Sequence, residues 1–221
     1  MIDRMDCVVI LARGASRRMG QPKGLLPCPG TDGRSFLATI AASYVELDLP
    51  MVVVTTPNLV EPYREIVADV DGCRVVGHGP GGDTARTVRQ GALAGDAQWT
   101  DQWTHLWIHP VDMPLIKTET LRQLWHHSLQ NPQASVRPGF AGRPGHPVIC
   151  PASGLMPLWD HGIWQEAAMR EVIALSRQLG HIEKSVLVPL EDPGVVTDFD
   201  SPADLDRFDN IPFSEDSDGS A

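Results

Sequence analysis

Cysteine is scarce in this sequence, and it never occurs in a metal-binding or redox pattern. Four cysteines are present among 221 residues, at Cys7, Cys28, Cys73 and Cys150. None forms a C-x-x-C pair or has the spacing of zinc ligands, which argues against a zinc site or a thiol redox centre. The sequence therefore predicts small, buried, reduced side chains at these positions.

Long apolar runs and surplus positive charge are also missing. No stretch approaches the roughly 20 apolar residues that a membrane-spanning helix requires, and the polar start MIDRMD predicts no secretory leader. The net charge of −10 argues against non-specific binding of nucleic acid. We therefore expect a cytoplasmic protein that binds neither nucleic acid nor a membrane.

Apolar, β-branched segments alternate along the chain with segments of helical periodicity. The predicted strands are 7–11, 51–55, 73–76, a strand starting at 106–109, 134–138 and 185–188, and the predicted helices are 35–47, 58–70, one after 84, one from about 117, 151–159, 165–179 and one from 201. This rhythm is typical of an α/β fold with a doubly wound, mostly parallel sheet and helices on both faces. We expect one domain over residues 1–211 and a disordered acidic tail over 212–221.

The stretch from Val8 to Pro27 combines a buried strand with a basic, glycine-bounded loop. Gly14 and Gly20 stand at the ends of the loop, and Arg17, Arg18 and Lys23 lie within it or just beyond. Glycine lets backbone N–H groups approach a ligand, and the cations neutralise an anion. The loop is not a Walker A loop, because Gly20 is followed by glutamine. It predicts a polyphosphate site at the carboxyl end of the first strand.

A second glycine-rich segment, GHGPGGDT at 77–84, matches G-x-G-x-x-G. It follows the third predicted strand, and the nearest acids lie in a polar loop, so it lacks the context of a dinucleotide fingerprint. The helix that follows it favours an anionic ligand at its N-terminus.

Carboxylates at two distant places are candidates for holding a cation against phosphates. Asp112 ends the fourth predicted strand, and a single aspartate is enough as a first protein ligand for Mg²⁺. Asp198, Asp200 and Asp204 lie together near the end of the predicted domain. His109 is expected to be structural, since Mg²⁺ prefers oxygen ligands.

The run LARGASRRMGQPKGLLP resembles the L-A-[AG]-G-x-S-x-R-M-G-x-x-K signature of MobA-like nucleotidyltransferases, and is most similar to the molybdenum-cofactor cytidylyltransferases. Later motifs follow in the family's order, so the resemblance covers roughly residues 6–208. It implies a Rossmann-like fold of the nucleotide-diphospho-sugar transferase type. Arg13 departs from the signature. In the family this position lies beside the base and is alanine in cytidine-type and glycine in guanosine-type enzymes.

The resemblance also implies roles for individual residues. Lys23, Arg18 and Asp112 would be catalytic, and PVDMP matches the family's metal motif. GDTARTVRQGAL and GRPGHPV resemble the family's ribose–base and acceptor segments, and D-x-D-[ST]-P-x-D-L resembles its closing motif. The implied nucleotide-binding residues are Leu11, Ala12, Arg13, Gly14, Ala15, Ser16, Arg17, Met19, Gly20, Thr87, Arg89 and Gly91; the acceptor-binding residues are Arg143, Gly145 and His146; the Mg²⁺ ligands are Asp112 with Asp198 or Asp200.

The implied activity is transfer of a nucleoside monophosphate from CTP to molybdopterin, with Mg²⁺ as cofactor and release of pyrophosphate. A molybdoenzyme that receives the product is an implied partner. Three alternatives stay open: GTP as donor, another small phosphorylated or alcohol acceptor, and a non-catalytic cofactor carrier or insertion chaperone. Pyrophosphate release separates a catalyst from a carrier.

Overall fold

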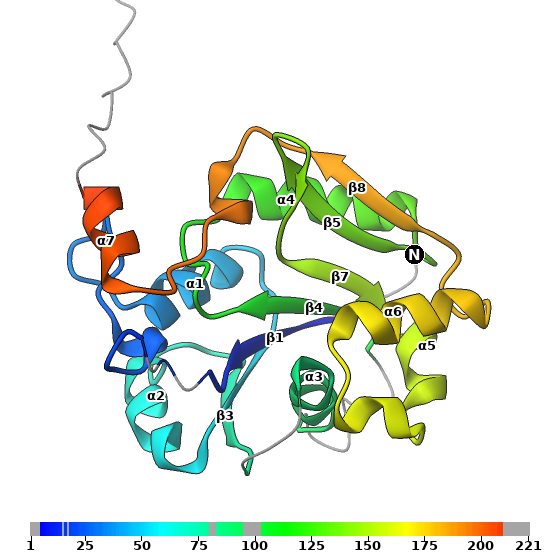
Figure 1. The fold of residues 1–221 in the computed structure, drawn as a ribbon, viewed down its shortest axis with the longest axis horizontal. Helices are drawn as coiled ribbons and strands as arrows, with labels where there is room; N and C mark the ends of the chain where they lie inside the picture. The colour runs from blue at the N-terminus through cyan, green and yellow to red at the C-terminus, as the bar shows by residue number, and fades with distance from the viewer. Residues whose placement is uncertain (1–4, 15, 17, 80–82, 95–102, 210–221) are drawn as a thin grey trace, which may run out of the picture.

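A computed structural model describes residues 5–14, 16, 18–79, 83–94 and 103–209. Its centre is an eight-stranded sheet in the order β3-β2-β1-β4-β7-β5-β6, with β8 beside β5 (Figure 1). The strands are β1 (Asp6–Ala12), β2 (Met51–Thr55), β3 (Cys73–Gly77), β4 (His105–Pro110), β5 (Ser135–Phe140), β6 (Arg143–Pro144), β7 (Val148–Pro151) and β8 (Ser185–Pro189). Neighbours from β3 to β4 are parallel, whereas β7 runs antiparallel to β4 and β5. The predicted α/β class with a mostly parallel sheet is confirmed.

Helices cover both faces of the sheet. One face carries α1 (Phe36–Val45), α2 (Val60–Ile66) and α4 (Thr118–Gln130), and the other carries α3 (Thr84–Leu93), α5 (Ala152–Leu155) and α6 (Met169–Gln178) (Figure 1). The helix α7 (Pro202–Asp209) follows the last strand, and the 3₁₀ helices are η1 (Lys23–Leu25), η2 (Pro57–Leu59), η3 (Met156–Leu158), η4 (Gly162–Gln165) and η5 (Pro193–Val196). The predicted N-cap of α1 is confirmed, because the Ser35 side chain accepts a hydrogen bond from the Ala38 amide.

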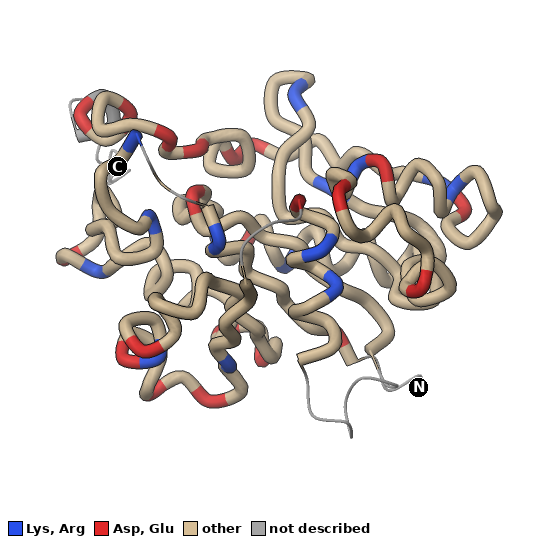
Figure 2. The backbone as a smooth tube through the Cα atoms, turned by 60° about the horizontal axis from the view of Figure 1, so that its bottom comes forward, with Lys and Arg blue, Asp and Glu red and all other residues tan. Residues whose placement is uncertain are grey.

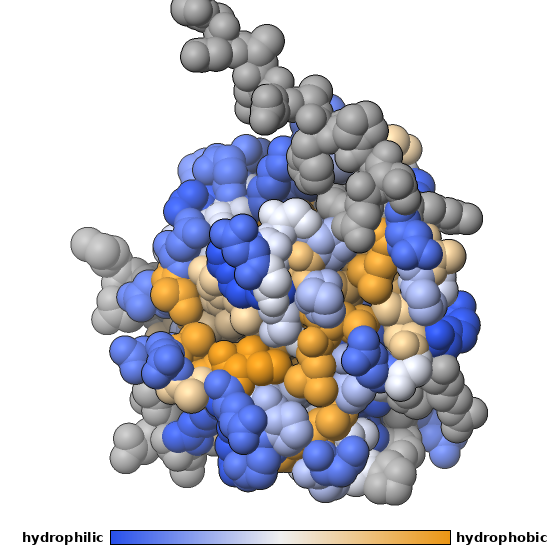
Figure 3. All heavy atoms as spheres, turned by 90° about the vertical axis from the view of Figure 1, so that its left-hand side faces the viewer, coloured by the Kyte–Doolittle hydropathy of each residue, from blue (hydrophilic) through white to orange (hydrophobic). Residues whose placement is uncertain are grey.

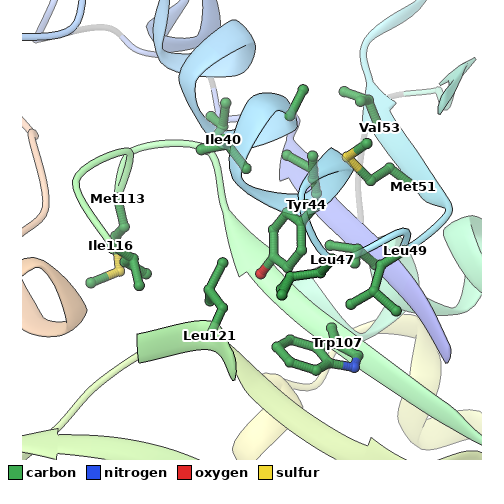
Figure 4. Packing of buried hydrophobic residues seen from close by; sticks show 14 of the residues in the cluster. Ile40, Tyr44, Leu47, Leu49, Met51, Val53, Trp107, Met113, Ile116 and Leu121 are labelled. Atoms are coloured by element: carbon green, nitrogen blue, oxygen red, sulfur yellow. The ribbon is translucent and has the colours of Figure 1, made fainter. Parts of the chain in front are cut away.

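The apolar run of β1 is continuous because both of its faces are covered. Val8 and Ile10 enter the cluster on the α1 face, and Cys7 and Val9 enter the cluster on the α3 face. On the α1 face, the rings of Tyr44 and Trp107 meet edge to face, with centroids 5.9 Å apart (Figure 4).

The cysteines are free, as expected. Cys7, Cys28 and Cys150 are buried, and Cys73 is half-buried. Burial raises the pKa of Cys7, Cys73 and Cys150 to about 12, so these thiols stay protonated at neutral pH. Within the described part of the chain, no helix combines the length and apolarity needed to cross a membrane. The expected tail over 212–221 lies outside the described residues.

Several predicted elements differ from the observed ones. The helix predicted over 58–70 is split into η2 and α2, and the helix predicted over 151–159 is split into α5 and η3. Pro157 stands at the start of η3, where a residue without an N–H group interrupts a regular helix. The predicted helix at 165–179 starts only at Met169, since Ala168 has extended backbone geometry. The short strand β7 was not predicted.

Candidate active site

A cavity of about 1140 Å³ lies at the edge of the sheet where β1 and β4 end. Its walls come from the loop after β1, the start of α3, the turn after β4, strands β5 and β7, and the start of α6. Figure 3 views the side of the molecule at which β4 ends and shows hydrophobic and hydrophilic residues mixed there. Acidic and basic positions are interspersed over the coloured part of the chain in Figure 2. The carboxyl edge of an open α/β sheet is the usual place for a ligand.

The centre of the site is an ionic cluster that joins three distant segments. Lys23 Nζ lies 2.8 Å from Asp112 Oδ2 and 2.5 Å from Asp200 Oδ1. Arg18 Nη2 lies 3.0 Å from Asp200 Oδ2. Lys23 belongs to η1, Asp112 follows β4, and Asp200 precedes α7. The structure thus brings together the three residues implied as catalytic and one of the two candidate second ligands.

Backbone and side-chain hydrogen bonds hold the two acidic segments in place. The amide of Phe199 donates to the Asp112 carbonyl at 3.0 Å. Asp204 Oδ2 accepts from the amides of Asp200 and Ser201 at 3.0 and 2.7 Å and from the Ser201 hydroxyl at 2.8 Å. These hydrogen bonds hold the backbone at Asp200 in place. Asp204 therefore positions Asp200 without itself lining the cavity.

The cluster sets the charge state of its members. Burial alone lowers the pKa of Lys23, but its hydrogen bonds to Asp112 and Asp200 and their negative charges more than offset this, so the pKa is raised. The hydrogen bond from Lys23 lowers the pKa of Asp200, and the charges of Lys23 and Arg18 act in the same direction. The lysine is therefore a cation, and Asp200 is a carboxylate, at neutral pH.

Asp112 and Asp200 form a donor set that fits a hard divalent cation. Their oxygens approach the same nitrogen, so they lie close together at the mouth of the cavity. Asp198 is exposed and does not line the cavity. Over the described ranges, no group of three or more His, Cys, Asp or Glu side chains could hold a metal. Two carboxylates suffice for Mg²⁺, which completes its shell with water and phosphate oxygens.

The loop after β1 is tied to η1 through Ser16, which has a positive φ of 45°. Ser16 Oγ accepts from the Lys23 amide at 3.2 Å, and the Ser16 carbonyl accepts from the amides of Met19 and Gly20. Leu11, Ala12, Arg13, Gly14, Ser16 and Arg18 line the cavity, as the resemblance implies. Ala15 and Arg17 lie outside the described residues.

Two further residues of this loop, Met19 and Gly20, do not line the cavity. Met19 is buried against Phe36 and Phe199, so its side chain faces a small core and not the cavity. Gly20 is exposed with φ +71° and provides the left-handed turn that ends the loop.

Arg13 bridges the first loop to the start of α3. Its Nη1 donates to Thr87 Oγ1 at 2.9 Å, and its Nη2 donates to the Gly79 carbonyl at 2.6 Å. Asp83 caps α3 by accepting from the Thr84 amide. Asp83, Thr84 and Thr87 line the cavity, so the implied position of Thr87 is found at the wall.

Arg89 and Gly91 lie farther along α3 and do not line the cavity. A Cβ on Gly91 would collide with the side chain of Val9, so this glycine allows α3 to pack closely on β1. Arg89 Nη2 lies 4.0 Å from Asp160 Oδ1 instead of at the wall. Helical geometry turns these two positions away from the cavity that Thr87 lines.

The residues of the implied acceptor segment also fall into two groups, one that lines the cavity and one that does not. His146 lines the cavity. Gly145 packs against the backbone carbonyl of Val195, which leaves no room for a Cβ, and Arg143 is exposed on β6 away from the wall. Burial lowers the pKa of His146, and the charge of Arg137 lowers it further, so the ring is neutral at pH 7. Its Nδ1 is buried without a hydrogen-bond partner in the described part of the structure.

His109 has the structural role that the sequence predicted. Its Nδ1 lies 2.8 Å from the Tyr44 hydroxyl and its Nε2 lies 3.0 Å from the Met113 carbonyl. Burial lowers its pKa to about 4. The ring is therefore neutral and faces the α1 side of the sheet, not the cavity.

The sequence did not identify several residues of the wall. Arg137 on β5 and Arg170 at the start of α6 add positive charge, and Ile108, Val148, Met169 and Ile173 add an apolar surface. The sequence offered one sign that Arg137 has a special role, namely that a charged residue interrupts a short apolar strand. The α6 residues carried no recognisable motif.

Comparison with known proteins matches residues 8–182 to the model of the MobA-like NTP transferase domain. A probable molybdenum cofactor guanylyltransferase of Mycolicibacterium paratuberculosis is 32% identical over 127 residues, which cover 57% of this chain and 59% of that protein. The match thus spans less than two thirds of this relative's length.

Solved structures share the fold at low identity. The 4-diphosphocytidyl-2C-methyl-D-erythritol synthase of Anaerococcus prevotii has a TM-score of 0.71 and 16% identity, over 94% of this chain and 96% of that one. Rv0371c of Mycobacterium tuberculosis H37Rv, in complex with manganese, has a TM-score of 0.65 and 19% identity, over 92% and 97% of the two chains. Because the family model covers most of the sequence, the chain belongs to the MobA-like NTP transferase domain family.

Proposed function

We propose that this protein transfers a nucleoside monophosphate from an NTP to the phosphate of a molybdopterin-type cofactor and releases pyrophosphate. The observation that carries the proposal is the convergence of Lys23, Arg18, Asp112 and Asp200 at one cavity. The family membership supports the same reaction, as does the similarity to a mycobacterial protein named as a probable molybdenum cofactor guanylyltransferase.

The reaction needs positioning and charge neutralisation more than a protein nucleophile. An oxygen of the acceptor phosphate forms a bond to the α-phosphorus, the bond to the α,β-bridging oxygen breaks, and pyrophosphate leaves with the electron pair. In this proposal Arg18, with backbone amides of the loop after β1, would hold the β- and γ-phosphates. Lys23 would neutralise the charge that grows on the α-phosphate and the leaving oxygen.

Asp112 and Asp200 would hold Mg²⁺ in this proposal. The bound ion would neutralise phosphate charge and orient the reacting oxygens. Lys23 must then exchange its two carboxylate partners for phosphate oxygens. The structure of a relative with manganese makes Mn²⁺ a suitable probe for such a site.

Whether the donor nucleotide is CTP or GTP is a separate part of the proposal. The expected preference for CTP rests on the resemblance of the first loop to the cytidylyltransferase signature. Arg13 departs from that signature at the position beside the base. The mycobacterial relatives, in contrast, are named guanylyltransferases. We favour GTP. An arginine fork can donate two hydrogen bonds to the adjacent O6 and N7 acceptors of guanine. Arg13 and its partner Thr87 both line the cavity, on the side where α3 begins.

Pyrophosphate release with each NTP, Mg²⁺ and molybdopterin tests the proposal. Release with GTP, lower with CTP, supports it. A carrier or insertion chaperone would bind the cofactor and release no pyrophosphate with any nucleotide. Release that depends on a different acceptor would keep the reaction class and overturn the acceptor.

A further inference from the structure

Strand register places Arg137 in the floor of the cavity. Ile108 of β4 pairs with Val148 of β7, and Val136 of β5 pairs with Ile149 of β7. Because β5 and β7 are antiparallel, Arg137 follows Val136 to a position opposite Val148, on the same sheet face. Ile108 and Val148 belong to the cluster between the sheet and α3, α5 and α6. Arg137 is therefore a cation within an apolar row, between Val148 of β7 and Leu187 of β8, on the sheet face that carries α6.

Arg137 has no counter-charge in the described part of the structure. Its Nε and Nη2 donate to the Gly145 carbonyl at 3.2 and 2.9 Å, and it makes no ion pair there. Arg18 and Lys23, in contrast, are paired with carboxylates on the same cavity. Burial lowers the pKa of Arg137 without removing its charge. A half-buried cation that is compensated only by one carbonyl favours an anionic ligand.

His146 connects Arg137 to the reaction centre. The carbonyl that Arg137 holds belongs to Gly145, the residue before His146. Arg137 and Asp112 are both near enough to the His146 ring for their charges to shift its pKa, in opposite directions. The buried Nδ1 of His146 has no hydrogen-bond partner in the described residues, and His146 lines the cavity, so a ligand that reached this nitrogen would satisfy it.

The neighbouring wall is apolar. Ile108, Val148, Met169 and Ile173 line the same cavity as Arg137. A ligand that lies on this wall with its charged end at Arg137 would have a flat or apolar body and an anionic group. An exposed cation such as Arg143, on β6 outside the cavity, could not select for such a body.

We propose that Arg137 and His146, with the apolar wall beside them, form a subsite for a phosphate monoester carried on a flat apolar body. The subsite is separate from the donor phosphates at Arg18 and Lys23. It rests on the proposed function in one respect, because it assigns the acceptor end of the same cavity. Arg137 binds the phosphate, and through the Gly145 carbonyl it also positions His146.

Direct binding tests this subsite without requiring turnover. The full chain is first saturated with α,β-methylene GTP and Mg²⁺, which fills the donor site, and phenyl phosphate is then titrated by calorimetry. The same titration is made with inorganic phosphate, with phenol and without nucleotide. The variants are Arg137→Met, Arg137→Lys and, as a matched loss of one charge on the adjacent strand, Arg143→Met. Circular dichroism and thermal melting check folding.

The expected result is saturable binding of phenyl phosphate, weakened at least about tenfold in Arg137→Met and unchanged in Arg143→Met. Arg137→Lys keeps the charge but not the planar fork of the guanidinium, so its affinity for phenyl phosphate is expected to lie between those of Arg137→Met and wild type. If Arg137→Met fails to fold, the affinity of Arg137→Lys is the test. Phenyl phosphate should bind more tightly than inorganic phosphate, and phenol should not bind measurably.

Two outcomes overturn the subsite while leaving the proposed function intact: the nucleotide analogue binds but phenyl phosphate does not, or the Arg137 variants bind phenyl phosphate as wild type does. Equal affinity for phenyl phosphate and inorganic phosphate overturns the assigned ligand class. If neither this analogue nor α,β-methylene CTP binds, the proposed function fails, and the titration without nucleotide still reports on Arg137.

Discussion

The ammonium nitrogen of Lys23 lies 2.8 Å from Oδ2 of Asp112, although 89 positions separate these residues in the sequence. The contact joins the loop after β1 to the turn after β4, which are neighbours because β1 and β4 pair in parallel. Asp200 reaches the same nitrogen from a third segment. The carboxyl edge of the sheet thus gathers two cations and two carboxylates at one place, and the proposed function assigns them to phosphates and to a metal.

Replacing Lys23 should abolish most of the activity without unfolding the protein. Lys23→Met is expected to lower kcat/KM for nucleotidyl transfer by about 10²–10³, as for loss of one oxyanion-stabilising donor. Lys23→Arg should recover part of this, because it keeps the charge. Thermal melting serves as the control, and a Lys23→Met variant with more than half of wild-type kcat/KM contradicts the assigned role.

Arg13 should control the choice of base. Arg13→Ala removes the fork that reaches Thr87 and Gly79. The ratio of kcat/KM for GTP over CTP is expected to fall at least about tenfold, which lies within the range of one bidentate contact to guanine. Competition between the two nucleotides in one assay measures the ratio. An unchanged ratio, with both activities intact, would show that Arg13 only braces the loop.

Gly91 should matter for stability and not for ligand binding. A methyl group there meets Val9, so Gly91→Ala is expected to lower the free energy of unfolding by about 1–3 kcal/mol. Gly162→Ala is the matched control, because no atom lies within 4 Å of a Cβ built there. Urea denaturation compares the two variants. Equal stability of both, with weaker nucleotide binding in Gly91→Ala, would restore the ligand role that the motif implied.

His109 should make the protein less stable in acid. Its pKa is lowered from 6.5 to about 4 by burial, so the unfolded chain takes up a proton that the folded protein refuses between these values. Stability is therefore full above pH 6.5 and declines as the pH falls, by up to about 3 kcal/mol near pH 4.

His109→Gln removes this titration while keeping hydrogen-bonding capacity toward Tyr44 and Met113. The variant is expected to be less stable than wild type at pH 7, and the difference should shrink between pH 6.5 and 4. Denaturant unfolding at a series of pH values measures it. A difference that stays constant over this range would contradict a neutral, buried His109.

The parts of this molecule that the sequence predicted well are those in which local pattern and tertiary role agree. The segment 51–55 is a strand with those bounds because a β-branched apolar run suits a strand buried on both faces. Lys23, Asp112 and Asp200 follow strands or precede a helix at one sheet edge, so motif and topology pointed to the same place. The strand β7 was missed because it is four residues long and follows a segment rich in glycine and proline.

Two glycines that the motifs implied at the site, Gly91 and Gly145, do not line the cavity, and they share a physical reason. A glycine in a motif permits close approach, but the sequence does not say whether a ligand or another part of the chain approaches. Gly91 admits Val9, and Gly145 admits the Val195 carbonyl. Arg137 was overlooked for the opposite reason, since its importance comes from register with β7 and not from any local motif.

The most direct test of the central claim is a crystal structure with α,β-methylene GTP and Mn²⁺, with the metal located by anomalous scattering. The account predicts one anomalous peak bound by carboxylate oxygens of Asp112 and Asp200, with Lys23 Nζ turned to the phosphates. A peak remote from both carboxylates, or a triphosphate that does not contact Lys23 and Arg18, would contradict it.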